Sequence, residues 1–178
     1  MKAYLIALML WLIASPLCGQ SFRTVSSEVS FFSSAPLEDI KANNEEVIGV
    51  FNADKGAIAF VVQIKGFQFA KSLMQEHFNE NFMESEKYPR ATFEGKVLDY
   101  NLTESGEQQA RVEGTMTIHG ESQEMEATGT FEKRVDEIIM KAIFPISLED
   151  YNISIPKILF QKIAEEVEVT VQFKFKEG

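Results

Sequence analysis

The chain has 178 residues and a formal net charge of −10, with 45% hydrophobic and 25% charged residues. This length suits one domain that follows a short leader. The acidic charge argues against nucleic acid or anionic lipid headgroups as partners, because both repel a negative surface.

Residues 1–19 have the pattern of a secretory signal peptide. The charged residue Lys2 precedes an apolar run over residues 3–14, which Ser15-Pro16 ends. The run is too short for a membrane span, which needs about 20 apolar residues. We therefore expect a mature domain of residues 20–178 with a formal charge of −11, periplasmic or secreted and without stable insertion in a membrane.

Cys18 is the only cysteine of the chain. Cleavage after Gly19 or Gln20 removes it, so we expect no disulfide and no thiol chemistry in the mature protein. Lipidation of Cys18 is the less favoured alternative, since a lipid-modified cysteine normally follows a small residue and here Leu17 precedes it.

Three strands are predicted in the first part of the mature domain, over residues 25–32, 47–51 and 57–64. In the first strand Val25, Val29 and Phe31 are spaced for one face. Pro36 and the run Ala42-Asn43-Asn44 predict a loop before the second strand. Residues 52–56 have the composition of a hairpin turn, and Gly66 predicts a bulge that lets Phe67 and Phe69 change sides.

The period then changes. Phe69, Leu73 and His77 recur at intervals of four residues, which predicts a short helix between Ala70 and Phe82. Tyr88-Pro89 ends this segment, because proline biases the residue before it away from the helical region.

The remaining strands are predicted over residues 91–97, 109–118, 123–132, 137–147 and 167–175. The last is the clearest, since each odd-numbered residue from Val167 to Phe175 is apolar and each even-numbered residue is polar. His119-Gly120-Glu121-Ser122 predicts a tight turn, and Pro156 predicts the start of a second short helix that ends near Glu165.

Eight strands with short connections predict an all-β fold, an antiparallel up-and-down barrel with one or two short helices. A β-sandwich is the alternative. Large and small residues alternate on the inward faces, which favours a barrel with room along its axis. The large inward residues are Phe31, Phe60, Val62, Phe93, Met116, Ile118, Met125, Phe131, Met140, Phe144, Val169, Val171 and Phe173, and the small ones are Ala91, Gly95, Gly114, Ala127, Gly129 and Ala142.

Three segments resemble the YceI-like family in their order and spacing: MQEHFNENFMESEKYPRATFEG (74–95), GTMTIHG (114–120) and FPISLEDYNISIP (144–156). The resemblance implies a lipocalin-like eight-stranded barrel in the periplasm that holds a polyisoprenoid or another long apolar lipid. Many members carry Arg-Asp two residues before the helix histidine, where this chain has Met74-Gln75.

If the barrel binds a lipid, we expect its large inward residues to line the cavity and the helix to lie at the cavity mouth. The expected lining is Phe31, Phe60, Val62, Phe93, Met116, Ile118, Met125, Phe131, Met140, Phe144, Val171 and Phe173, with His77 and Phe78 at the mouth.

The sequence gives no signal for catalysis, a cofactor or a metal. Its two histidines, His77 and His119, are far apart and lack the accompanying ligand pattern of a metal site. No Gly-x-Ser-x-Gly or phosphate-binding glycine motif is present. We therefore expect a non-catalytic protein that binds an apolar lipid. The alternatives are an envelope interaction or stress-response protein with a packed core and a protein partner and, third, a hydrolase-type enzyme.

Overall fold

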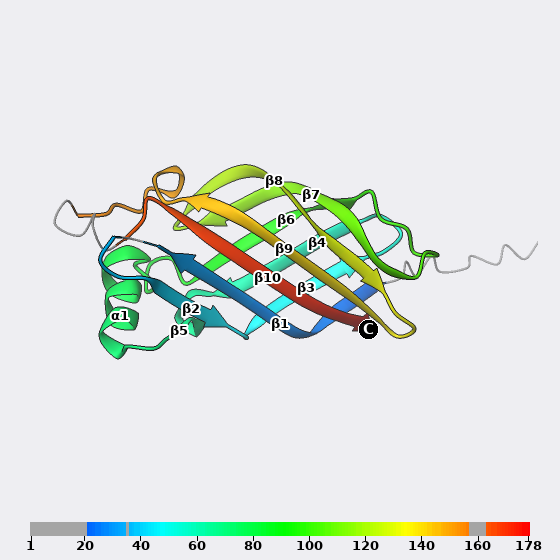
Figure 1. The fold of residues 1–178 in the computed structure, drawn as a ribbon, viewed down its shortest axis with the longest axis horizontal. Helices are drawn as coiled ribbons and strands as arrows, with labels where there is room; N and C mark the ends of the chain where they lie inside the picture. Colours follow the sequence, from blue (N-terminus) through cyan, green and yellow to red (C-terminus); the bar gives the residue numbers. More distant parts are fainter. Residues whose placement is uncertain (1–20, 35, 157–162) are drawn as a thin grey trace, which may run out of the picture.

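A computed structural model describes residues 21–34, 36–156 and 163–178 (Figure 1). The predicted signal peptide and most of the predicted helix over residues 156–165 lie outside these ranges. The strands are β1 Ser21–Ser33, β2 Ile40–Asn44, β3 Val47–Asn52, β4 Ala57–Gln63, β5 Gln68–Phe69, β6 Arg90–Leu98, β7 Gly106–Ile118, β8 Glu121–Lys133, β9 Glu137–Ser147 and β10 Glu166–Glu177. The helical segments are the 3₁₀ turns η1 Ile64–Gly66 and η3 Glu149–Tyr151, the α-helix α1 Ser72–His77 and the π-helical turn η2 Phe78–Phe82.

Within the described residues, eight antiparallel strands close into a barrel in the order β1, β3, β4, β6, β7, β8, β9 and β10. The ring closes because β10 pairs with β1 from Phe22 opposite Glu177 to Phe32 opposite Glu168. Strands β2 and β5 continue the sheet beyond the second half of β1, beside α1 (Figure 1). The predicted eight-stranded barrel is confirmed. None of the helices in the described ranges is long and apolar enough to cross a bilayer.

The predicted loop at Ala42-Asn43-Asn44 is wrong, because these residues belong to β2. Ala42 pairs with Phe31 of β1 and with Phe69 of β5. Asn44 is fully buried, where its Nδ2 donates to the Gln63 carbonyl at 2.8 Å and its Oδ1 accepts from the Glu46 amide at 2.8 Å. Ladder hydrogen bonds and these side-chain bonds thus override the turn preference of asparagine.

The inward placement of Val25 is also wrong. The register between β1 and β10 shifts between Thr24 and Ser26, which is a β-bulge. As a result Val25 is 56% exposed, whereas Ser27 and Val29 are buried. The predicted change of sides before Phe67 is confirmed, but the 3₁₀ turn η1 produces it in place of a bulge.

The predicted helix over residues 70–82 is confirmed as α1 followed by η2. The predicted turn after β7 is a two-residue hairpin connection, in which His119 and Gly120 both have positive φ, 52° and 84°. This backbone suits the twist of a hairpin, and histidine tolerates the left-handed region better than most residues.

Aromatic rings fill one half of the barrel interior, around Phe51. The Phe51 ring lies 6.0 Å from that of Phe131, 6.2 Å from that of Phe175 and 5.7 Å from that of Tyr100. The Tyr100 hydroxyl donates to the Ala53 carbonyl at 2.6 Å, and burial, with the nearby Asp54 carboxylate, raises the pKa of this tyrosine. This half is a close-packed core, and it lies away from α1.

The alternation of β10 yields a direct test of the barrel. Phe173 is 2% exposed and packs against Phe60, whereas Gln172 is exposed on the opposite face. Phe173→Asp should therefore destabilise the fold by several kcal/mol, because it buries an unpaired carboxylate. Gln172→Asp should change the free energy of unfolding by less than about 0.5 kcal/mol. Urea unfolding measures both, and equal losses would show that both faces of β10 are buried.

Candidate functional site

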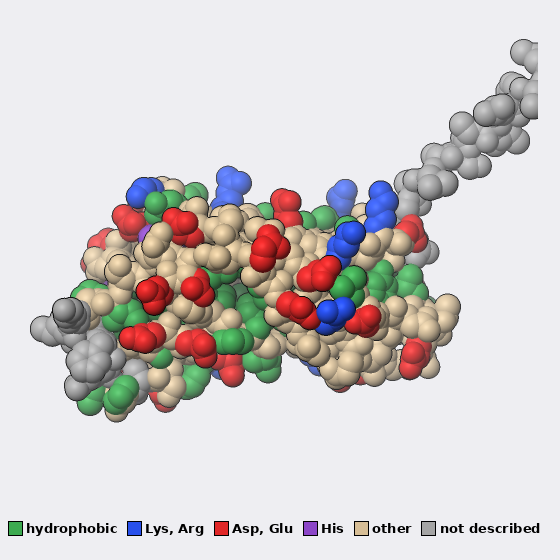
Figure 2. All heavy atoms as spheres, turned by 90° about the horizontal axis from the view of Figure 1, so that it is seen from above, with side chains coloured by type: hydrophobic (Ala, Val, Ile, Leu, Met, Phe, Trp, Pro, Cys, Tyr) green, Lys and Arg blue, Asp and Glu red, His purple; other side chains and the backbone are tan. Residues whose placement is uncertain are grey.

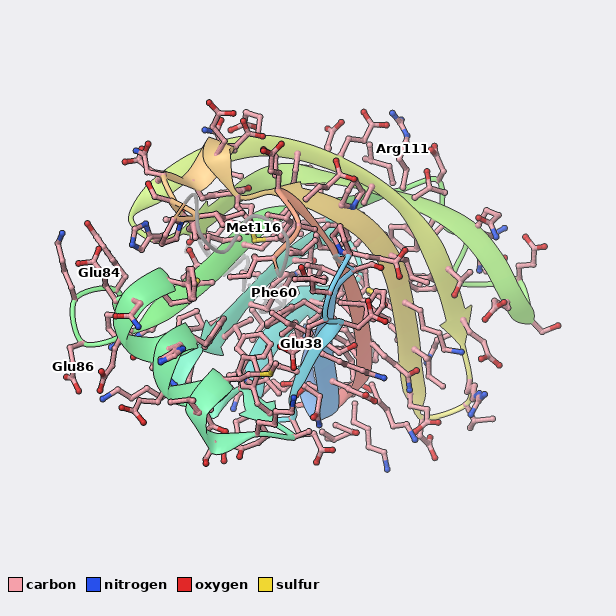
Figure 3. The ribbon with its side chains drawn as sticks, turned by 60° about the vertical axis from the view of Figure 1, so that its left-hand side comes forward. Glu38, Phe60, Glu84, Glu86, Arg111 and Met116 are labelled. Carbon is pink, nitrogen blue, oxygen red and sulfur yellow. The ribbon has the colours of Figure 1, made fainter. Side chains whose placement is uncertain are left out.

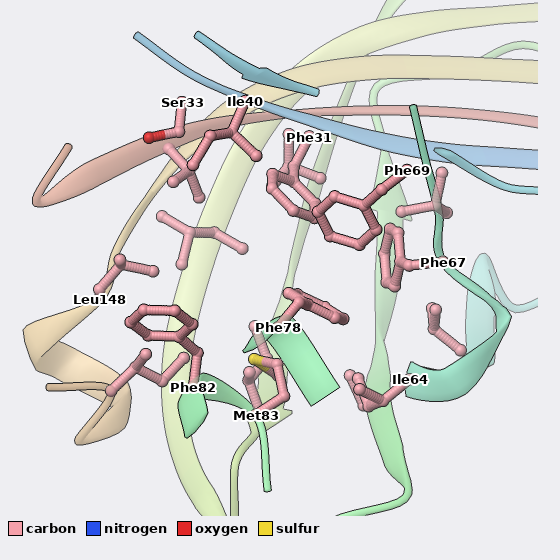
Figure 4. A pocket seen from close by; sticks show the side chains of 18 of the residues that line it. Phe31, Ser33, Ile40, Ile64, Phe67, Phe69, Phe78, Phe82, Met83 and Leu148 are labelled. Carbon is pink, nitrogen blue, oxygen red and sulfur yellow. The ribbon is translucent and has the colours of Figure 1, made fainter. Parts of the chain in front are cut away.

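The other half of the barrel holds a cavity of about 450 Å³ (Figure 4). Its wall is formed by the inward faces of the barrel strands, by η1 and β5, and by α1 and η2. The lining is almost entirely aliphatic or aromatic. Cavities of this size and composition suit small-molecule ligands, and this one suits an apolar ligand.

Phe60 forms the floor of the cavity and packs against Phe93 and Phe173, which lie below it and outside the lining. The Phe60 ring lies 5.2 Å from that of Phe93 and 5.1 Å from that of Phe173. In Figure 3 Phe60 and Met116 lie inside the barrel, while Arg111 lies on its outer surface. A second, smaller cavity of about 60 Å³ lies at this level and shares Phe60 and Met116 with the large one.

The predicted lining divides between the two cavities. Seven of its residues contact the large one: Phe31, Phe60, Val62, Met116, Ile118, Phe144 and Val171. The other five surround only the small one: Phe93, Met125, Phe131, Met140 and Phe173. Period-2 alternation identifies the inward face of a strand but carries no information on depth along the barrel axis. Direct ligand contact by any of these residues stays a prediction.

The alternation of large and small residues predicted room along the barrel axis beside the small ones. Not all of the small inward residues leave such room. Gly95 and Gly114 oppose each other in the β6–β7 ladder. A Cβ atom on Gly114 would lie 2.3 Å from the Glu94 carbonyl oxygen and 2.9 Å from the Phe93 ring. These glycines therefore permit close strand approach and the position of Phe93, and the space beside them is filled.

The helical segment forms part of the cavity wall at the α1 end. His77 and Phe78, the residues expected at the mouth, both lie in the cavity lining. The π turn places Phe82 and Met83 in the wall as well, since the Met83 amide bonds to the Phe78 carbonyl five residues back. Phe78 anchors the segment, because its ring lies 5.6 Å from Phe31.

Phe67 and Phe69 complete this aromatic cluster, with centroids 5.5 and 5.0 Å from Phe78 (Figure 4). Sequence reasoning missed both as lining residues, although it had placed their change of sides. Lining residues of α1 and of the loops were missed as well. Two of those in α1, Leu73 and Met74, could have been found from the apolar face of the helix.

Polar side chains are few in the lining. Lys71 and Glu38 form an ion pair with Nζ and Oε1 2.5 Å apart. The Ser33 hydroxyl accepts a hydrogen bond from the Ala164 amide at 3.0 Å. These three groups are thus engaged with the protein itself. Among the described residues, no three His, Cys, Asp or Glu side chains gather in a way that could hold a metal ion.

His119 joins three segments outside the cavity wall. Its Nδ1–H donates to the Tyr151 carbonyl at 3.1 Å, and its Nε2 lies 3.0 Å from a Glu84 carboxylate oxygen. Its ring also packs against Tyr88, with centroids 4.5 Å apart. The side chain is only 10% exposed.

Each segment that His119 joins also supplies a cavity residue. Ile118 precedes it in β7, Met83 precedes Glu84, and Ile153 follows Tyr151 by two positions. Contacts of His119 therefore hold η2 and η3 against the end of β7, which keeps three parts of the cavity wall together.

The comparisons with known proteins agree with this geometry. A family model for the YceI-like domain matches residues 21–175. The chain belongs to the YceI-like family. No curated protein matches it.

Solved structures similar to the chain share its fold at low sequence identity. A polyisoprenoid-binding domain from Saccharophagus degradans, implicated in plant cell wall breakdown, is 14% identical with a TM-score of 0.78, over 89% of this chain and 99% of that chain. BcnA from Burkholderia cenocepacia is 17% identical with a TM-score of 0.72, over 83% and 95%. The YceI protein of Campylobacter jejuni is 16% identical with a TM-score of 0.66, over 80% and 87%.

The two histidines form a matched pair for a test of the His119 contacts. His119→Asn keeps a residue that tolerates positive φ but removes the ring, so we expect a loss of about 1 to 3 kcal/mol in the free energy of unfolding. His77 is exposed although it borders the cavity, so His77→Asn should change this free energy by less than about 0.5 kcal/mol. Urea unfolding of the mature domain compares the two variants. Equal effects would contradict a specific role of His119 in holding the wall.

Proposed function

We propose that this YceI-like protein binds a long apolar lipid of the polyisoprenoid class in the barrel cavity and catalyses no reaction. The observation that carries the proposal is the cavity of about 450 Å³ with an almost wholly apolar wall. Burial of a methylene group from water contributes about 0.8 kcal/mol before the costs of ordering, so a long chain can be held by its hydrocarbon alone.

The fold relationship supports the same ligand class. The Saccharophagus degradans domain binds polyisoprenoids and shares the barrel over nearly all of its own length. An interaction protein with a filled core, the first alternative, fits less well with the large cavity.

The polar groups of the lining favour a ligand with an uncharged end. The ammonium group of Lys71 is paired with Glu38, so an anionic headgroup would have to displace that carboxylate. The acidic surface adds unfavourable charge for such a headgroup. Among the described residues, the lining has four polar side chains, and three of them, Ser33, Glu38 and Lys71, are held by protein contacts, which favours binding without chemistry. The fourth is His77.

We also propose that the protein works in the periplasm or outside the cell. The support is the signal-peptide pattern of residues 1–19, followed at once by the first barrel strand, whose Ser21 accepts a hydrogen bond from the Gly178 amide at 3.1 Å. Partners other than the lipid, such as an envelope protein, are compatible with this location.

Two neighbouring residues of β6 test the proposed function. Ala91 lines the large cavity, and Thr92 points to the outer face of the same strand. Ala91→Phe should fill ligand space and weaken binding of solanesol, a long isoprenoid alcohol, by about tenfold or more. Thr92→Phe should bind solanesol like the unmutated protein.

Bound solanesol is measured by mass spectrometry after incubation with loaded vesicles and gel filtration, and thermal melting checks that both variants fold cooperatively. Failure of the unmutated protein to take up solanesol or farnesol, or equal binding by the two variants, would contradict the proposal.

A further inference from the structure

The seam between β8 and β9 is paired over only half its length. The two strands pair from Gly129 opposite Ala142 to Lys133 opposite Ile138. Beyond Gly129, β8 continues for eight residues to Glu121, and it stays paired with β7 throughout. Beyond Ala142, β9 continues to Ser147 and stays paired with β10. Residues 121–128 and 143–147 therefore face each other across the seam without a ladder.

A comparable gap between β1 and β3 is closed by side chains, which makes the β8–β9 seam distinctive. The Thr24 hydroxyl accepts from the Gly49 amide at 3.0 Å, and the Ser27 hydroxyl donates to the Val47 carbonyl at 2.9 Å. In the described ranges, no side-chain hydrogen bond or ion pair joins residues 124–128 of β8 to residues 143–147 of β9. Pro145 lies in this stretch of β9. Proline has no N–H to donate to a neighbouring strand and occurs in sheets mainly where a strand edge is unpaired.

The unpaired part of the seam is bounded at both ends. At mid-barrel it ends where the ladder begins, at Gly129 and Ala142. At the α1 end η3 and the residue after it bridge to β8, since Gln123 Nε2 donates to the Asp150 carbonyl at 2.8 Å and Asn152 Nδ2 to Glu121 Oε1 at 2.9 Å. We call the unpaired stretch between residues 124–128 and 143–147 the lateral window.

The lateral window has an apolar frame and lies next to both cavities. Met125 contacts the small cavity, Ile146 contacts the large one, and Phe144 contacts both. Ile143 is 60% exposed on the outer side. Figure 2 looks onto the face that carries β8, where hydrophobic side chains lie in a depression bordered by acidic ones.

We propose that the lateral window is a second opening of the binding site, through which the end of a long apolar chain passes between the β8 and β9 edges. This inference rests on the proposed function. It adds that the aromatic core in the other half of the barrel does not limit the length of the lipid that binds. A chain that reaches the floor at Phe60 turns outward past Phe144 and Met125. Isoprenoids longer than the cavity can therefore bind, and their exchange depends on the window.

A pair of cross-links that share one residue tests the window. Glu126 pairs with Glu113 of β7 on one side and, by continuation of the β8–β9 register, faces Pro145 on the other. Glu126→Cys with Pro145→Cys closes the window when bridged by a short bis-maleimide. Glu126→Cys with Glu113→Cys gives the matched control, a bridge of the same type across a seam that is already paired. All three positions are exposed, and the mature domain carries no other cysteine.

The measured quantity is the rate at which bound solanesol moves from the protein to acceptor vesicles of phosphatidylcholine. The cross-window bridge should slow this transfer by about tenfold or more, and the control bridge should leave it unchanged. Transfer of farnesol, which is short enough to leave through the mouth at α1, should be affected much less. If the first pair fails to cross-link, Thr128→Cys with Ile143→Cys replaces it one step nearer the ladder.

The outcomes separate the two proposals. Unchanged solanesol transfer in the cross-window variant, or equal slowing by both bridges, overturns the lateral window while leaving lipid binding in place. An unmodified protein that takes up neither solanesol nor farnesol overturns the proposed function, and the window with it. Cooperative melting of each bridged variant confirms that the barrel is intact.

Discussion

The packing of Phe60 between Phe93 and Phe173 sets the organisation of the barrel interior. On one side of this stack, rings around Phe51 fill the barrel as a close-packed core; on the other, the wall encloses a cavity of about 450 Å³. A volume that side chains do not fill gives up contacts between side chains and so costs stability. The filled half offsets that cost, since it buries several large aromatic side chains completely.

The cavity depends equally on segments that are not part of the ring of eight strands. Phe67 after η1, Phe69 of β5 and Phe78 of η2 bring these segments together over the end of β1. Their rings lie 5.0 to 5.8 Å from one another or from Phe31. His119 holds the far side of the same segment against the β7–β8 turn. The helical segment is therefore a fixed part of the cavity wall.

Sequence patterns were informative where one physical rule decided the outcome. The alternation of β10 predicted its buried face, because a strand with one apolar side has only one favourable register. Strand β2 was missed since Asn43 and Asn44 look like turn residues, and only their pairing with β1 makes them a strand. The depth of Phe93 and Phe131 and the close approach at Gly114 depend on barrel tilt and stagger, which no single strand encodes. The lateral window likewise begins where the β8–β9 ladder ends, which the pattern of neither strand reveals.

The central claim is that the apolar half of the barrel exists to hold a lipid chain. The most direct measurement is organic extraction and mass spectrometry of the protein, purified without detergent from its native cells. The account predicts a single class of long-chain apolar lipid in near-stoichiometric amount. A folded protein that yields no such lipid, and whose extract matches that of a secreted control protein without a cavity, would contradict it.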